Sequence, residues 1–115
     1  MLKLLEEPAP GFQGMGLSAP MLKALATVNY QSPSPIQAAF IPVALQGGDC
    51  TGQARTGTGK TAAFVIPILE RIDLNRNETQ AIVLTPTREL SEQVSEEVRR
   101  LAQEHAATIE GYEAL

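Results

Sequence analysis

The stretch Gly52-Gln-Ala-Arg-Thr-Gly-Thr-Gly-Lys-Thr61 decides how the rest of the chain is interpreted. A polyphosphate needs several backbone N–H groups that converge on it, with no side chains in the way. Gly57 and Gly59 meet both needs, because they lack a Cβ and tolerate positive φ. The glycines lead into a predicted helix, whose unpaired N-terminal amides and positive dipole end attract anions. The stretch therefore predicts a loop that binds a nucleoside triphosphate.

Two residues at the end of this loop carry the expected chemistry. Lys60 can reach the β and γ phosphates as a point charge, and the Thr61 hydroxyl can bind a magnesium ion that bridges the phosphates. The usual pattern is G-x-x-x-x-G-K-[ST], and Ala54 stands in its first position here. The alternative is a flexible glycine loop beside an incidental lysine. Gly-x-Gly-Lys-[Ser/Thr] arises rarely by chance in so short a chain, which favours the phosphate loop.

The segments around the loop alternate between strand-like and helix-like patterns. Residues 49–53 and the continuously apolar run 81–84 are predicted strands, the second covered on both faces. Helices are predicted after the N-caps Ser18 and Ser34, from Lys60 to about Leu74, and after Thr85-Pro86, where Leu90, Val94, Val98 and Leu101 form an apolar stripe. Residues 1–16, rich in glycine and proline, are a predicted flexible lead-in. This order predicts an α/β fold with a parallel sheet flanked by helices.

Composition narrows the class of protein further. The chain has 115 residues, enough for one small domain, with 43% apolar and 19% charged residues and a formal charge of −4. That charge excludes the broad basic surface of an independent duplex-binding protein. The single cysteine (Cys50) excludes an internal disulfide, and the single histidine (His105) leaves no zinc-type ligand set. No apolar stretch is long enough to span a bilayer, and residues 1–7 make a poor signal peptide, so we expect a cytoplasmic protein.

Three stretches, taken in order, resemble the DEAD-box RNA helicases. Ala54–Thr61 is similar to motif I of that family, which carries alanine where other phosphate loops begin with glycine. Tyr30-Gln-Ser-Pro-Ser-Pro-Ile-Gln37 resembles its Q motif, with Phe12 at the place of the isolated upstream aromatic, and Pro86-Thr-Arg-Glu-Leu90 resembles motif Ia. The resemblance covers residues 12 to about 102. It implies that residues 17–115 form the N-terminal part of a first RecA-like P-loop NTPase domain, truncated before the Walker B strand.

The Q motif has a physical rationale of its own. The side chain of Gln37 offers one acceptor and one donor, which match the N6 and N7 edge of adenine and not the two acceptors of guanine. Tyr30 would stack on the base, and the resemblance implies that Phe12 supports this pocket. The alternative is that Tyr30 is a core aromatic, Gln37 a surface helix residue and Phe12 a packing anchor. Asn29 replaces the usual glycine before the aromatic, and both residues tolerate positive φ.

The resemblance also implies a set of ligands and the residues that bind them. Motif Ia would contact the sugar–phosphate backbone of RNA without reading its sequence, and the N-terminus of a helix at this point suits a phosphate. The alternative for Arg88 is a surface ion pair with Glu92, four residues on. The implied RNA contacts are Pro86, Thr87 and Arg88. The implied contacts to ATP and Mg²⁺ are Phe12, Tyr30, Gln37, Arg55, Thr56, Gly57, Thr58, Gly59, Lys60 and Thr61, with Lys60 and Thr61 catalytic and the Thr61 hydroxyl on the metal.

Several parts of the helicase machinery do not occur in this sequence. It contains no Asp-Glu pair, no Ser-Ala-Thr motif and no second domain with arginine fingers. We therefore expect this chain to bind ATP without efficient hydrolysis, and to serve ATP-dependent RNA unwinding only within a full-length enzyme. The alternative is a truncated, non-catalytic module that binds a nucleotide or a partner. A kinase or GTPase is disfavoured because the guanine signature is missing. An incomplete sheet would also leave an exposed edge, which favours self-association.

Overall fold

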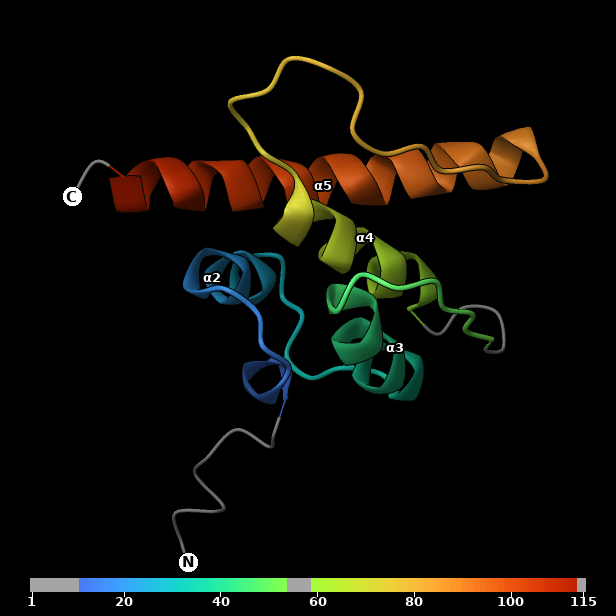
Figure 1. Ribbon diagram of the computed structural model, residues 1–115, viewed down its shortest axis with the longest axis horizontal. Helices are drawn as coiled ribbons and strands as arrows, with labels where there is room; N and C mark the ends of the chain where they lie inside the picture. The colour runs from blue at the N-terminus through green and yellow to red at the C-terminus, as the bar shows by residue number, and fades with distance from the viewer. Residues whose placement is uncertain (1–10, 54–58, 114–115) are drawn as a thin grey trace, which may run out of the picture.

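The computed structural model describes residues 11–53 and 59–113, with side chains through residue 106. The elements are a 3₁₀ turn and four α-helices (Figure 1). In chain order they are η1 (Phe12–Gly14), α2 (Ala19–Thr27), α3 (Pro35–Leu45), α4 (Lys60–Arg71) and α5 (Arg88–Glu113).

The two N-terminal helices begin where their capping residues predict. The Ser18 hydroxyl accepts a hydrogen bond from the Met21 N–H at 3.2 Å, which satisfies one of the free amides of the first turn of α2. At α3, Ser34 and Gln37 form a reciprocal capping box, and Pro35 occupies the first helical position. Both starts agree with the sequence analysis.

The end of α4 and the start of α5 differ from the predicted positions. α4 ends at Arg71 and not near Leu74, because Asp73 redirects the chain: its carboxylate accepts the Asn75 N–H at 3.0 Å in a local turn. α5 starts after Thr87, whose hydroxyl accepts the Leu90 N–H at 3.1 Å, and it continues to Glu113. The connector between them is closed by the Gln80 side chain, which pairs with the backbone N–H and C=O of Asp73 at 2.9 Å each.

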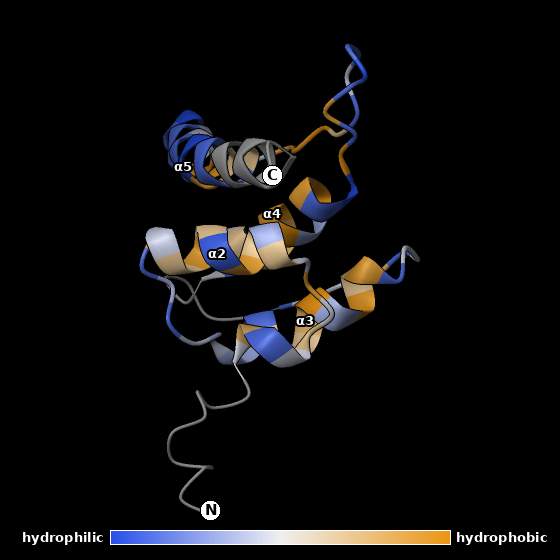
Figure 2. Cartoon of the chain, turned by 90° about the vertical axis from the view of Figure 1, so that its left-hand side faces the viewer, coloured by the Kyte–Doolittle hydropathy of each residue, from blue (hydrophilic) through white to orange (hydrophobic). Residues whose placement is uncertain are grey.

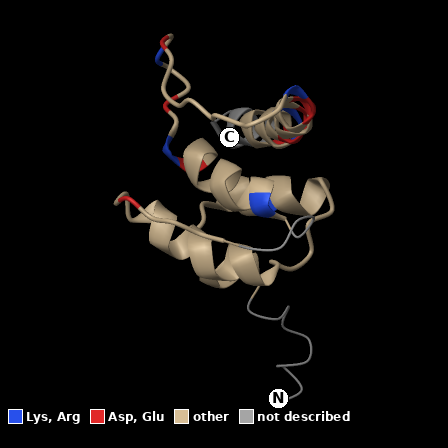
Figure 3. Cartoon of the chain, turned by 90° about the vertical axis from the view of Figure 1, so that its right-hand side faces the viewer, with Lys and Arg blue, Asp and Glu red and all other residues tan. Residues whose placement is uncertain are grey.

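The helices stack in three tiers around one core. Figure 2 shows α5 above, α2 and α4 in the middle, and α3 below. The largest fully buried side chains come from all four helices: Met21, Leu25, Ile41, Val65, Ile66 and Leu101. Phe12 and Met15 join this core, so ordered packing begins before residue 17, the predicted start of the domain. Figure 3 shows that the charged residues lie mainly on α5 and on the connector that precedes it.

The predicted parallel sheet is wrong for the part of the chain that the structure describes, where no residue is in a strand. Residues 49–53 pass α3 and α4 without strand pairing, and residues 81–84 lead toward the start of α5 without regular secondary structure. A strand exists only when a neighbouring strand accepts and donates its backbone hydrogen bonds. The two apolar segments do not pair with each other, so the observed architecture is all-helical and not the α/β layer that their composition indicated.

One polar cluster joins three of the helices. The Glu70 carboxylate, near the end of α4, accepts hydrogen bonds from the Ser18 backbone N–H at 2.6 Å and from the Ser18 hydroxyl at 2.8 Å. It also lies 3.8 Å from Nε2 of His105 on α5, and that histidine is buried. Burial lowers the pKa of His105 below its ordinary value, and the nearby Glu70 charge opposes this shift. The cluster therefore fixes α2 and α5 to the C-terminal end of α4.

Candidate nucleotide site

The N-terminus of α4 is the centre of the candidate site. Gly59 is the residue before the helix, with φ of +82°, and no side chain caps the free amides there. Lys60 is exposed in the first helical position, and Thr61, the second, is half-buried. Free backbone N–H groups, a positive helix end and an ammonium group thus lie within three consecutive residues, which is an arrangement suited to an anion.

Gln37 connects this helix end to α3. Its side chain is only 5% exposed, and Nε2 donates a hydrogen bond to the Gly59 carbonyl oxygen at 3.2 Å. Its Oε1 accepts the Ser34 N–H at 3.0 Å. Gln37 is therefore buried and is not the surface helix residue of the alternative interpretation. Its side chain contacts Gly59, the residue that precedes α4.

Gly59 could hardly be another residue. A Cβ at this position would lie 2.5 Å from Gln37 Nε2, closer than side-chain carbons approach other atoms, and the positive φ adds strain for any L side chain. Asn29 is the only non-glycine residue with positive φ in the described ranges, at 68°, as its place before the aromatic predicted.

The ring of Tyr30 contacts two side chains. The ring of Phe12 stacks on it with centroids 6.5 Å apart and planes at 24°, and the guanidinium carbon of Arg100 lies 5.5 Å from the Tyr30 ring centroid. Arg100 in turn donates to the Glu97 carboxylate at 3.4 Å. Phe12 is buried in the core, and its ring contact in this region is with Tyr30.

A cavity of about 630 Å³ lies beside Tyr30 and the start of α4, and neither Gln37 nor Phe12 is among the residues that line it. Gly59, Lys60 and Thr61 line one side, Tyr30 and Glu97 line another, and the segment from Val83 to Pro86 closes it toward α5. The structure therefore places Tyr30, the start of α4 and Pro86 around one space. Thr87 and Arg88 lie just outside it at the start of α5, while the predicted contacts Arg55, Thr56, Gly57 and Thr58 lie outside the described residues.

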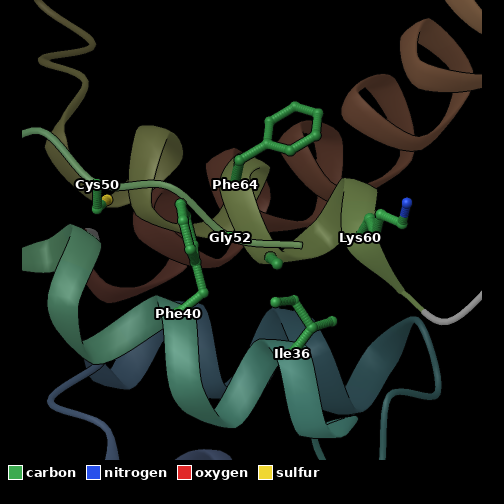
Figure 4. A pocket seen from close by; sticks show the side chains of 7 residues that line it. Ile36, Phe40, Cys50, Gly52, Lys60 and Phe64 are labelled. Carbon is green, nitrogen blue, oxygen red and sulfur yellow. The ribbon is translucent and has the colours of Figure 1, made fainter. Parts of the chain in front are cut away.

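A second cavity, of about 260 Å³, lies between α3 and α4 (Figure 4). Phe40, Ile36 and Phe64 make most of its wall, with Cys50 at one end and Lys60 at the other. Its lining offers only one charged group, which suits a polyphosphate poorly. The larger cavity is the better candidate for a nucleotide.

Two contacts in the candidate site were missed by sequence reasoning. The spacing Ser34-x-x-Gln37 is that of a capping box, so the Ser34 N–H contact could have been predicted from the sequence. The contact of Arg100 with Tyr30 joins residues 70 positions apart, and no local pattern indicates it. Arg88, for which a pair with Glu92 was the alternative, makes no ion pair within the described part of the chain.

Comparison with known proteins identifies the family. A DEAD/DEAH box helicase family model matches residues 34–114. The DEAD-box ATP-dependent RNA helicase CshA of Geobacillus kaustophilus is 50% identical over 90 residues, which is 78% of this chain and 19% of that protein. The ATP-dependent RNA helicase DRS1 of Yarrowia lipolytica is 48% identical over 95 residues, 80% of this chain and 13% of that protein. The chain thus spans about a fifth or less of these relatives.

Solved structures give the same result. A DEAD box protein from Methanococcus jannaschii superposes with a TM-score of 0.74 and 42% identity, over 80% of this chain and 25% of that one. The RNA helicase Prp28 from Chaetomium thermophilum, bound to ADP, gives 0.76 and 42% over 84% and 25%. Dbp5 from S. cerevisiae, bound to RNA and ADP BeF3, gives 0.72 and 35% over the same shares. On this evidence the chain belongs to the DEAD/DEAH box helicase family and corresponds to an N-terminal region of its members.

Proposed function

We propose that this chain binds ATP, with Mg²⁺, at the N-terminal end of α4. The observation that carries the proposal is the hydrogen bond from Gln37 to the Gly59 carbonyl, because it joins the residue suited to reading adenine to the start of the phosphate helix. In this arrangement the free amides and Lys60 hold the phosphates, and Tyr30 stacks on the base with Phe12 behind it. The predicted contacts Arg55, Thr56, Gly57 and Thr58 would complete the loop.

The hydrogen-bonding capacity of Gln37 supports this role. A side-chain amide has two N–H donors and an oxygen with two lone pairs, and the observed bonds to Gly59 and Ser34 use one of each. One donor and one acceptor remain, and these match N7 and the N6 amino group of adenine. Guanine presents acceptors at both places, so its O6 would meet the amide oxygen of Gln37.

The metal requirement fits the residues present. Thr61 lies beside Lys60 on the cavity wall, and its hydroxyl is the hard oxygen ligand that magnesium prefers. Among the described residues no group of three His, Cys, Asp or Glu side chains could hold a metal on its own. Magnesium would therefore enter together with the phosphates, where it neutralises their charge, while Lys60 and the helix amides orient them.

We further propose a role for this chain within a full-length helicase. Residues 17–115 would be the N-terminal portion of the first helicase domain, and ATP-dependent unwinding of RNA would require the rest. Pro86, Thr87 and Arg88 would contact the RNA backbone. Prp28 was solved with ADP bound, and Dbp5 with RNA and ADP BeF3 bound. These two structures support the proposal that this region binds a nucleotide and RNA. The cytoplasm, where ATP, magnesium and RNA occur together, is the compartment that we propose; no helix of the described residues is long and apolar enough to cross a membrane.

The proposal is tested by nucleotide titration of Gln37 variants. Gln37→Ala should weaken Mg–ATP binding by about tenfold or more and Mg–GTP binding much less, because two hydrogen bonds to adenine are lost at roughly 1 kcal/mol each. Isothermal titration calorimetry measures both affinities. Gln46→Ala, at the exposed C-terminal end of the same helix, is the matched control and should change neither.

A second variant separates binding from folding. Gln37→Glu keeps the acceptor for the Ser34 N–H but cannot donate to the Gly59 carbonyl or to N7 of adenine. It should lose ATP discrimination while the chain retains its helical circular dichroism. Equal losses for ATP and GTP in both variants would remove the adenine-reading role of Gln37.

A further inference from the structure

The backbone of Tyr30 is fixed by the turn that ends α2. Asn29, just before it, has a left-handed conformation with φ of 68°. The Asn29 N–H donates to the Ala26 carbonyl at 3.0 Å, and the Tyr30 N–H donates to the Leu25 carbonyl at 2.8 Å. These two hydrogen bonds form a Schellman motif, which satisfies carbonyl groups at the end of a helix. The ring of Tyr30 therefore starts from a fixed point, and its side-chain torsions decide where it lies.

Two side chains restrict these torsions without filling the space beside the ring. Phe12 stacks on Tyr30 with ring centroids 6.5 Å apart, and the guanidinium carbon of Arg100 lies 5.5 Å from the Tyr30 ring centroid. Tyr30 lines the cavity of about 630 Å³, whereas Phe12 and Arg100 do not. Both contacts therefore limit the orientation of the ring and leave the cavity open to a ligand.

Arg100 is itself oriented by a neighbour on its own helix. It lies on α5, which packs against α2, and its Nη2 donates to the Glu97 carboxylate at 3.4 Å. Side chains three residues apart on a helix are neighbours, so this pair limits where the guanidinium can lie. The guanidinium is attracted to the Tyr30 ring by the quadrupole of the aromatic system. The chain of contacts thus runs from Glu97 through Arg100 to the ring.

We propose that Arg100 is a positioning residue of the nucleotide site, and that its guanidinium holds the Tyr30 ring in the orientation that stacks on a base. The inference rests on the proposed function, because it needs a base at Tyr30. Stacking on an aromatic ring tolerates any base, so Arg100 supports ATP and GTP alike. In this respect Arg100 differs from Gln37, which is proposed to distinguish the two bases. The polyphosphate is held at the start of α4 and does not need the ring.

Calorimetry with three probes, Mg–ATP, Mg–GTP and Mg–tripolyphosphate, tests this role. Arg100→Met removes the cation and keeps a long unbranched side chain. It should weaken ATP and GTP binding by about two- to fivefold more than tripolyphosphate binding, which is the usual effect of losing a guanidinium from an exposed ring. Arg99→Met is the matched control. It removes the same charge one residue earlier, and Arg99 makes no ring contact among the described residues.

Two further variants test whether Arg100 acts through Tyr30. Arg100→Lys keeps a cation near the ring and should retain more of the ATP affinity than Arg100→Met does. In a Tyr30→Leu background, Arg100→Met should cause no further loss of ATP relative to tripolyphosphate, because the ring through which it acts is gone. A second, additive loss would mean that Arg100 contacts the nucleotide directly, and it would overturn the positioning role. Far-UV circular dichroism checks that each variant keeps its helices.

The outcomes separate this inference from the proposed function. If the unaltered chain bound Mg–ATP no more tightly than Mg–tripolyphosphate, the base would make no contact, and both the role of Tyr30 and that of Arg100 would be overturned. If ATP bound more tightly than tripolyphosphate, and Arg100→Met changed that ratio no more than Arg99→Met, only the inference would be overturned. Equal losses on all three probes would also overturn it, because Arg100 would then act through the fold or through its charge alone.

Discussion

At the level of single residues, the candidate nucleotide site depends on which groups form hydrogen bonds with the side-chain amide of Gln37. A buried amide must find partners for its donors and acceptors, and Gln37 finds them in the Ser34 N–H and the Gly59 carbonyl. Its chemical identity could be read from the sequence, and so could the capping-box spacing. Its contact with Gly59, 22 residues further on, could not, since it depends on α3 packing against α4. Local spacing thus predicted the residue, and tertiary packing determined its partner.

Substitution of Gly59 tests this contact. Gly59→Ala should destabilise the chain by about 1–2 kcal/mol through the positive φ alone. It should also displace the Gln37 amide, because the new Cβ would lie 2.5 Å from Nε2, and ATP binding should fall with it. Gly16→Ala is the matched control: φ is +84° there, but nothing lies within 4 Å of the added carbon.

The two variants separate strain from displacement. In urea denaturation, both variants should lose a similar amount of unfolding free energy, because both place a side chain at a positive φ. Only Gly59→Ala should also lose affinity for Mg–ATP. If Gly59→Ala bound Mg–ATP as tightly as Gly16→Ala, the contact between Gly59 and Gln37 would have no role in the site.

Arg88 is the residue on which the RNA proposal depends most. It lies exposed at the first position of α5, where a free guanidinium and the helix N-terminus can both contact a phosphate. Arg88→Ala should weaken binding of a labelled single-stranded RNA and lower the salt dependence of that binding by about one ion. Arg99→Ala, also exposed but more than two turns along the same helix, should change neither; equal effects of the two would indicate non-specific attraction.

At the scale of elements, helices were predictable where the chain carries its own start signal. α2 and α3 begin after a serine cap followed by proline, and these contacts span only three residues. The strands were not predictable in this way. The run Ala81–Leu84 has the composition of a buried strand, but strand formation requires a second segment at hydrogen-bonding distance, and none of the described residues provides one. Composition predicted a strand covered on both faces, and this is wrong for the described residues, where the run is unpaired and Ile82 and Leu84 are exposed.

The start of α2 is the element whose anchoring is most directly testable. Ser18→Ala removes the cap to Met21 and the hydroxyl bond to Glu70, so it should cost about 1–2 kcal/mol, the upper part of the usual range for a cap. Ser32→Ala, at an exposed position without a hydrogen bond in the described residues, should cost less than about 0.5 kcal/mol. Chemical denaturation measures both. A neutral Ser18→Ala would show that the two hydroxyl contacts, to the Met21 N–H and to Glu70, do not stabilise the start of α2.

At the scale of the whole molecule, the polar cluster of Ser18, Glu70 and His105 joins helices from both ends of the chain. Burial lowers the pKa of His105 in the folded state, while the unfolded chain keeps the ordinary value near 6.5. As the pH falls below that value, His105 binds a proton in the unfolded chain more readily than it does in the folded chain. The stability contributed by neutral His105 is therefore present above pH 6.5 and is lost as the pH falls.

Denaturation between pH 7.5 and 5.5 tests this linkage. The free energy of unfolding should fall over this range, and His105→Gln should flatten the fall, since glutamine of similar size does not titrate. A stability that rises on acidification, and does so only with His105 present, would show that attraction between charged His105 and Glu70 outweighs burial.

The binding of ATP at the N-terminus of α4 can be followed through the amide resonances of that end of the helix. On addition of Mg–ATP to the folded, isotope-labelled chain, the backbone amides of Gly59, Lys60 and Thr61 and the side-chain amide of Gln37 should shift together, with one saturating affinity. Mg–GTP should move the first three and leave the Gln37 side chain nearly unchanged. Two results would contradict ATP binding at the N-terminus of α4. One is resonance shifts confined to the residues around the Phe40 and Cys50 cavity, and the other is unchanged amide resonances of residues 59–61 at saturating ATP.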